Sequence, residues 1–350
     1  MTVNKVRKSF QCFMIVMIIF CMFSGMRLSA ESKADDVVLH AWEVFSYSDA
    51  EWSDYTVQNT EALYDKNGTI IGSLLELTDS EDDAYAIVLN NNGSAIVVET
   101  GKGISSPYAG YENKMKVFTS PLNYYVMDSK ESSVLLDLTN KETITKESLS
   151  STLFPTISSG SDQRVENTRS TVTYLYNYST YFENCVQPNG YACVPTSHAM
   201  ALKYLHNRGK ITISSTYTNV STMATKLYDM MKSSDGHCYT PTIQNQFASF
   251  CSSYTNKTIT STVTWNSGMT FSAAKSEIDV MYPLVLMFVG GTPNMYSSNH
   301  ATTMVGYKIV TGTTTMNYAI VVDPGTSPGV QKTMAWDSTY LYGYFILTVY

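Results

Sequence analysis

Short apolar runs separated by turn residues fill the first half of the chain. From residue 61 the sequence reads ALYDKNGTIIGSLLEL and then DAYAIVLNNNGSAIVVET, with further apolar runs in KVFTS, LNYYVM and SVLLDL. The Asn-Gly steps at 67–68 and 92–93 lie between apolar runs, an arrangement typical of β-hairpins. This pattern predicts a mostly β region with low helix content.

The second half changes from this pattern to a helical one. Ala199, Leu202 and Leu205 recur at the spacing of one helix face, and Gly209 is a suitable end for that helix. Further helices are expected at 222–232 and 272–281, and strands at 283–290, 301–310, 316–323 and 342–349. We therefore predict an α+β fold in which a helical front precedes an antiparallel sheet.

Two segments carry neither pattern. Residues 1–30 combine a basic start, an apolar run and small residues at the end, which is typical of a secretory signal peptide. The alternative is an uncleaved membrane anchor, but the apolar run falls short of the roughly 20 residues of a spanning helix. Residues 155–170 are polar and contain Gly and Pro, as expected of a linker open to proteolysis. The predicted division is therefore a signal peptide, a β-rich region at 31–154, this linker and a second domain at 171–350, with secretion as the expected destination.

Charge is distributed unevenly between the two regions. Residues 31–168 hold 23 acidic and 9 basic residues, a net charge of −14, whereas residues 169–350 carry +3. This asymmetry predicts mutual attraction of the two regions, the alternative being an ordinary solvated surface on each. An acidic chain without a basic stripe is not expected to bind nucleic acid.

The four cysteines that remain after signal removal all lie in the second half, as Cys185, Cys193, Cys238 and Cys251. Four cysteines in about 180 residues do not form a disulfide scaffold. If Cys193 is a working thiol, at most one bridge remains, and Cys238 with Cys251 is the expected pair. No paired CxxC or HxxxH spacing is present, so no metal or other cofactor is expected.

Cys193 is the candidate nucleophile. It directly precedes the first turn of the predicted helix, where the helix dipole favours a thiolate; the alternative is a buried structural cysteine. Gln187 lies six positions earlier, across a Pro-Asn-Gly turn. Its amide and the Cys193 backbone N–H are therefore predicted to hold the oxyanion of an acyl-transfer intermediate.

His300 is the candidate base. It opens the predicted strand HATTMVGYKIV, and the next predicted strand, MNYAIVVD, ends in Asp323. A turn near residues 311–312 sets His300 opposite Asp323 to within about two residues, and opposed Cβ atoms lie ~4.5–5.5 Å apart. We therefore predict that Asp323 orients the imidazole as third member of a triad. Its alternative role is that of a turn residue before the Pro-Gly step at 324–325.

The other histidines fit the role of base less well. His198 lies ~140° around the helix from Cys193, so a surface or packing role is expected. His206 lies further along the same helix, His40 belongs to the acidic region, and His237 lies in a polar loop.

These residues resemble a known superfamily. The run CVPTSHAMALKYLHNRG is similar to the catalytic-cysteine helix of papain-like cysteine peptidases, above all the bacteriocin-leader-peptidase-like, streptopain and staphopain groups. The Q-x5-C, H-a-x-x-x-x-G-Y and D-P motifs of these groups correspond to Gln187 with Cys193, to HATTMVGY from His300 and to VVDPG around Asp323. The resemblance covers most of residues 175–350 and implies a papain-like α+β fold and amide hydrolysis through a thioester. Val194 follows the nucleophile where many relatives have Gly, and the spacing from His300 to Asp323 is longer than usual.

Several functions are compatible with this pattern. The first hypothesis is a secreted cysteine endopeptidase stored as a zymogen, because the N-terminal half loosely resembles streptopain-type pro-segments and is expected to act as an intramolecular inhibitor. The equal alternative for that half is a β-rich binding domain that is never removed. Other hypotheses are a papain-like amidase acting on cell-wall peptides, an acyl transferase using the same groups, and a non-enzymatic surface protein with a vestigial site.

Overall fold

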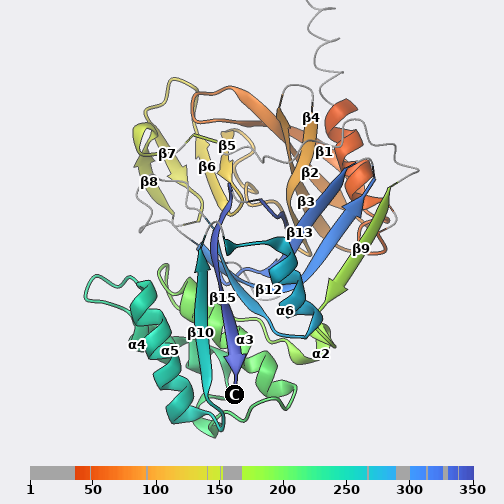
Figure 1. Cartoon of the computed structure of the whole chain (residues 1–350). Coiled ribbons are helices and arrows are strands. Elements are labelled where there is room, and N and C mark those ends of the chain that lie inside the picture. Colours follow the sequence, from red (N-terminus) through yellow and green to blue (C-terminus); the bar gives the residue numbers. More distant parts are fainter. Residues whose placement is uncertain are drawn as a thin grey trace, which may run out of the picture.

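The computed structural model describes residues 36–47, 49–91, 94–139, 141–149, 151–152, 168–265, 268–288, 300–312, 314–325, 330–337 and 339–350 (Figure 1). The predicted signal peptide and residues 155–167 of the predicted linker lie outside this set. Within it, no helix has the length and apolar character needed to cross a membrane.

The N-terminal region begins with a helix at 36–46 and continues almost entirely as strands. The strands are β1 (Thr56–Tyr64), β2 (Ile70–Thr78), β3 (Asp83–Asn91), β4 (Ser94–Lys102), β5 (Met115–Ser120), β6 (Asn123–Met127), β7 (Val134–Asp137) and β8 (Glu142–Thr145). A short 3-10 helix, η1 (Lys146–Ser148), follows. The helix at 36–46 was not predicted. Its Val38, Trp42 and Phe45 are buried and follow the i, i+4, i+7 spacing of one helix face, a signal in the sequence that the prediction missed.

The C-terminal region alternates helices and strands. Its elements are β9 (Arg169–Tyr174), α2 (Tyr178–Tyr181), α3 (Cys193–Asn207), η4 (Ser215–Tyr217), α4 (Val220–Met231), α5 (Thr240–Tyr254), β10 (Ile259–Trp265), α6 (Phe271–Asp279), β11 (Leu284–Phe288), β12 (His300–Thr311), β13 (Thr315–Val322), β14 (Gln331–Ala335) and β15 (Leu341–Val349). The prediction of an α+β fold is confirmed at the level of a mixed structure with a large sheet and helices. Arg169 and Ser170, placed in the predicted linker, begin strand β9.

One continuous sheet joins the two regions. Its strand order is β10-β15-β11-β12-β13-β14-β4-β3-β2-β1-β5-β6-β7-β8, and β9 pairs with β12 outside this path. The junction is the antiparallel pair of β14 with β4, in which Gln331 faces Lys102 and Met334 faces Glu99. In Figure 1, strands β1–β8 lie in the upper part, helices α3, α4 and α5 in the lower part, and β12 and β15 between them.

A second contact joins the regions through the helix at 36–46. Phe45 of this helix packs edge-on against Tyr318 of β13, with ring centroids 5.1 Å apart. Beside them the Lys308 ammonium of β12 is fully buried and lies 2.6 Å from the Asp49 carboxylate. Buried charges need such partners, because an unpaired charge in the interior is strongly unfavourable. The N-terminal region therefore shares both the sheet and the hydrophobic core of the C-terminal region.

The four described cysteines are free thiols, so the expected Cys238–Cys251 bridge is not formed. Cys251 lies on the fully buried face of α5, whereas Cys238 lies near Cys193. Burial raises the pKa of the Cys238 thiol to about 12, helped by the nearby Cys193, and burial alone raises that of Cys251 to about 12. Both side chains are thus protonated, apolar packing groups.

Candidate active site

Cys193 is the first residue of helix α3 and is largely buried. The preceding residue, Ala192, makes no side-chain cap, so the backbone N–H groups of the first turn keep their positive end toward Cys193. Such a position favours the negatively charged form of a thiol. Local structure alone therefore gives Cys193 one of the requirements of a nucleophile.

Helix α3 is attached to the strand that carries His300. Ser197 donates from its hydroxyl to the Ala301 carbonyl over 3.3 Å, and Thr303 donates to the Ser197 carbonyl over 3.1 Å. Both bonds are buried. They hold the first turns of α3 against the start of β12, which fixes Cys193 relative to His300.

His300 and Asp323 form a close pair. Nε2 of His300 donates to Oδ1 of Asp323 over 2.6 Å, and the Gly325 backbone N–H donates to the same oxygen over 2.8 Å. Strands β12 and β13 pair with Thr303 opposite Val322, and a register irregularity lies between Met304 and Gly306. The residue after Val322 is thereby brought to the imidazole, although the two positions are not directly opposed.

The electrostatics of this pair favour the imidazolium–carboxylate state. Burial lowers the pKa of His300, but the Asp323 charge and hydrogen bond, together with a hydrogen bond to Cys193, raise it to about 10. Burial likewise raises the pKa of Asp323, yet Lys332 and His300 hold it well below its usual range. Because Asp323 occupies Nε2, Nδ1 is the ring nitrogen left to exchange a proton with Cys193.

Gln187 is tied to the same loop as Asp323. Its backbone N–H donates to the Pro324 carbonyl over 2.8 Å, so the turn before α3 and the end of β13 meet. The side-chain Oε1 is buried and has no hydrogen-bond partner. The predicted residues Gln187, Cys193, His300 and Asp323 therefore come from three separate segments that converge at one end of α3.

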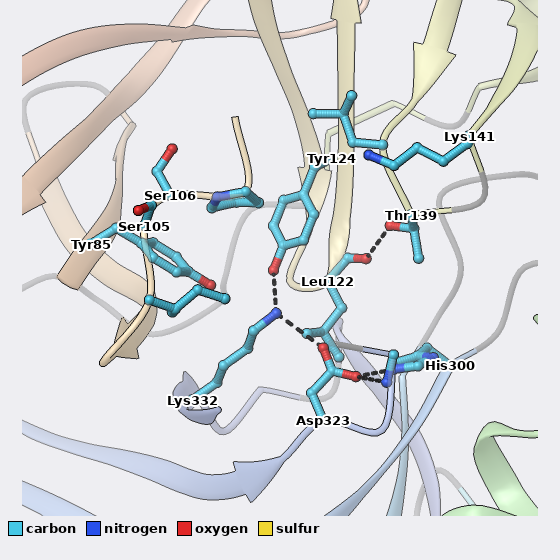
Figure 2. A pocket seen from close by; sticks show the side chains of 14 residues that line it. Tyr85, Ser105, Ser106, Leu122, Tyr124, Thr139, Lys141, His300, Asp323 and Lys332 are labelled. Atoms are coloured by element: carbon cyan, nitrogen blue, oxygen red, sulfur yellow. Dashed lines mark hydrogen bonds and ion pairs between the residues drawn. The ribbon is translucent and has the colours of Figure 1, made fainter. Parts of the chain in front are cut away.

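The second oxygen of Asp323 leads into a buried network that the sequence did not indicate (Figure 2). Lys332 of β14 lies 3.0 Å from Oδ2 of Asp323 and donates to the Tyr124 hydroxyl over 3.0 Å. Tyr124 in turn donates to Glu99 of β4. Tyr85 donates to the same Glu99 oxygen over 2.6 Å, and the Leu122 N–H donates to the other over 3.0 Å. The N-terminal region thus reaches the catalytic candidates through Lys332.

A cavity of about 430 Å³ opens beside His300. His300, Asp323, Gly325 and Lys332 form one wall, and the rest comes from the N-terminal region (Figure 2). These residues are Tyr85, Ile104, Ser105, Ser106, Pro107, Leu122, Tyr124, Leu138, Thr139 and Lys141. Most of the wall is therefore supplied by the part of the chain that lies outside the predicted peptidase domain.

The remaining histidines contact other groups. His198 is completely buried, contacts the Val194 carbonyl and the Ser261 hydroxyl at 2.9 Å, and packs against two phenylalanine rings. Burial lowers the pKa of His198 to about 4, so it is a neutral packing residue. His206 contacts the Ile211 carbonyl, His237 packs against Tyr191, and His40 lies in the N-terminal helix. Among the described residues, no group of three His, Cys, Asp or Glu side chains is arranged to hold a metal ion.

Comparison with known proteins agrees with the resemblance to cysteine peptidases. Residues 176–345 match the model of the Peptidase_C39 like family, which spans Gln187, Cys193, His300 and Asp323. This match confirms the resemblance to papain-like cysteine peptidases. At the general level it indicates a cysteine peptidase, that is, a hydrolase. No curated protein matches the chain.

Proposed function

Starting from this family match, we propose that the protein is a cysteine peptidase that hydrolyses peptide bonds with Cys193, His300, Asp323 and Gln187. The observation that carries the proposal is the 2.6 Å bond from His300 to Asp323 beside the thiol at the start of α3. A nucleophile next to a base, with the base oriented by a third group, is the arrangement that activates a side chain for covalent catalysis.

The proposed reaction has two stages. Cys193 transfers its proton to Nδ1 of His300 and attacks the carbonyl carbon of the scissile bond as a thiolate. The resulting oxyanion is stabilised by the Cys193 backbone N–H and the Gln187 amide. His300 then protonates the departing amine, and the C–N bond breaks to leave a thioester on Cys193.

Water completes the cycle. His300, neutral after giving up its proton, accepts one from the water molecule that attacks the thioester. The second oxyanion collapses, the C–S bond breaks, and the acid product leaves with Cys193 again a thiolate beside the imidazolium. Asp323 keeps the ring oriented throughout and stabilises its positive charge.

The proposal also covers secretion and processing of the chain before catalysis. Residues 1–30 have the composition of a signal peptide, so the enzyme is proposed to be secreted. It is further proposed to be made as a precursor whose activity is limited by its N-terminal region until the chain is cut within residues 155–168. Arg164 in this polar stretch is a suitable point for such a cut.

The test is a labelling and turnover assay on residues 31–350, in the intact form and after a specific cut within 155–168. Casein cleavage is measured together with iodoacetamide labelling of each cysteine, and Cys193→Ala is the control. The expected result is casein cleavage that is faster for the cut form than for the intact form, with Cys193 labelled much faster than Cys185, whose thiol pKa burial raises. If neither form cleaves casein and Cys193 labels no faster than Cys185, the peptidase proposal fails.

A further inference from the structure

We propose that Lys332, held by Glu99 and Tyr124 of the N-terminal region, positions Asp323 for His300, so that the N-terminal region is a lasting part of the active site. This inference rests on the proposed peptidase function and deepens it. It assigns Lys332, Glu99 and Tyr124 a positioning role, because they act on the reaction only through Asp323. A cut in the linker would then leave the N-terminal region in place.

Sheet register places these side chains together. In β14, Lys332 faces Val321 of β13 on one side and Gly101 of β4 on the other. Side chains two residues apart in a strand point to the same face, so Asp323, two after Val321, lies diagonally beside Lys332. Glu99, two before Gly101, lies diagonally on the opposite side. Lys332 is therefore set between the two carboxylates by the junction strand itself.

Gly101 makes the arrangement possible. The next strand, β3, sets Tyr85 opposite Gly101. A Cβ atom on residue 101 would lie 2.3 Å from the Tyr85 ring, closer than any real contact. The missing side chain lets the ring lie across the strand, from where its hydroxyl reaches Glu99. The side chains of Tyr85, Glu99, Lys332 and Asp323 thus form a polar row on one face of the sheet. This row runs from the N-terminal strands to the catalytic aspartate.

The charges explain why the row is buried as a unit. The Lys332 and Glu99 side chains are 1% and 0% exposed, and that of Asp323 is 4% exposed. Glu99 and Asp323 with Lys332 carry a net charge of −1, which the imidazolium of His300 neutralises. Burying one member without the others would leave an uncompensated charge, which is strongly unfavourable. Loss of the N-terminal region would remove Glu99 and leave β14 without its β4 partner.

Asp323 has two oxygens, and each has a fixed donor. Oδ1 accepts from His300 and from the Gly325 N–H, whereas Oδ2 faces Lys332. A carboxylate held on both sides keeps its plane aligned with the imidazole. Lys332 also keeps Asp323 ionised, since its positive charge lowers the pKa of that carboxyl. Orientation and ionisation of the catalytic aspartate are therefore both linked to a lysine that the N-terminal region holds.

The test compares two double variants of residues 31–350, each cut within 155–168, that each remove one buried lysine–carboxylate pair. Lys332→Met with Glu99→Gln removes the pair at the site, and Lys308→Met with Asp49→Asn removes the equivalent pair across the same interface, away from it. Both leave the net charge unchanged. For each we measure the pH profiles of kcat and of kcat/KM with a peptide substrate, and thermal unfolding.

The expected result separates positioning from stability. The site variant loses about tenfold or more in kcat with little change in KM, and its acid limb moves to higher pH, because the Asp323 carboxyl then lacks the Lys332 charge that lowers its pKa. The control variant keeps the kcat and pH profile of the unmodified protein at a comparable loss of melting temperature. Should the site variant not fold, Tyr124→Phe, which removes only one hydroxyl, is expected to move the acid limb in the same direction by less.

Two negative outcomes are distinguishable. In the first, the unmodified protein cleaves peptides and the site variant keeps the same kcat and pH profile. Lys332 is then only a structural residue, and the inference is overturned. Where the site variant does not fold, an unchanged kcat and pH profile of Tyr124→Phe leads to the same conclusion. If the unmodified protein, cut in the same way, neither cleaves peptides nor labels at Cys193, the proposed function itself has failed.

Discussion

His300 and Asp323 lie 23 residues apart in the chain, yet Nε2 of the imidazole is 2.6 Å from Oδ1 of the carboxylate. The contact depends on the hairpin of β12 and β13, because β12 begins and β13 ends beside the start of α3. Because Lys332 approaches the other oxygen of Asp323, the carboxylate accepts from two strong donors at once. This double role makes Asp323 unusually sensitive to replacement by its amide.

We expect Asp323→Asn to lower kcat by about a hundredfold or more. An amide has only one acceptor oxygen, so either His300 or Lys332 must face its NH2 group. A wrongly paired histidine loses its tautomer and orientation, the effect seen when the triad aspartate of serine peptidases becomes asparagine. Steady-state kinetics with a peptide substrate measure the loss.

The matched control adds Lys332→Met to Asp323→Asn. With the competing donor gone, the amide oxygen is free to face His300, so part of the lost kcat is expected to return. If Asp323→Asn alone keeps the full rate, the two-donor description of this residue is wrong.

The pH dependence of Cys193 labelling follows from the raised pKa of His300. The imidazolium is present below about pH 10 and is lost as the pH rises through that value. Its charge favours a neighbouring thiolate, so at pH 6 we expect iodoacetamide to label Cys193 about tenfold or more faster in the unmodified protein than in His300→Ala. Mass spectrometry of the alkylated peptide measures both rates. Equal rates at pH 6 would show that His300 does not activate the thiol.

Gln187→Ala is expected to separate oxyanion stabilisation from thiol activation. Loss of one oxyanion donor costs about 10²–10³ in kcat in other acyl-transfer enzymes, and the same range is expected here. Iodoacetamide labelling of Cys193 forms no oxyanion, so its rate is expected to stay within about twofold. A change in KM alone, with kcat retained, would assign Gln187 to substrate binding instead.

The sequence predicted what depends on local pattern. A helix that follows directly after Cys193 was predicted from a 3.6-residue repeat, and the structure begins α3 at Cys193 itself. The approach of His300 to Asp323 follows from a single hairpin. The register differed by a few residues, because Thr311 pairs with Thr315 and an irregularity interrupts the strand at Met304. Such irregularities depend on packing against neighbouring strands, which a local pattern does not contain.

The buried network could not be predicted in the same way. Glu99 and Lys332 are separated by more than 200 residues, and each stands in a strand where a charged residue normally faces solvent. Their meeting requires the pairing of β4 with β14, an arrangement that no repeat or motif indicates. The available signal was weak: the charge asymmetry of the two regions predicted attraction, but gave neither the strands nor the residues involved.

The junction between the regions gives the last prediction, which concerns the chain after cleavage. The β4–β14 pairing, the contact of Phe45 with Tyr318 and the buried Lys308–Asp49 pair all cross it. After a specific cut within 155–168, we expect the two fragments to elute together in gel filtration under native conditions and to separate only with denaturant.

A single replacement tests the strength of this junction. Asp49→Asn leaves the buried Lys308 ammonium without its counter-charge, a change that typically costs about 3–5 kcal/mol. The cut Asp49→Asn protein is therefore expected to dissociate at lower urea than the cut unmodified protein, while Asp54→Asn, a change at an exposed position, serves as control. If the unmodified fragments separate without denaturant and the C-terminal fragment alone becomes fully active, the N-terminal region is a removable inhibitor and its carboxylate Glu99 is not needed for catalysis.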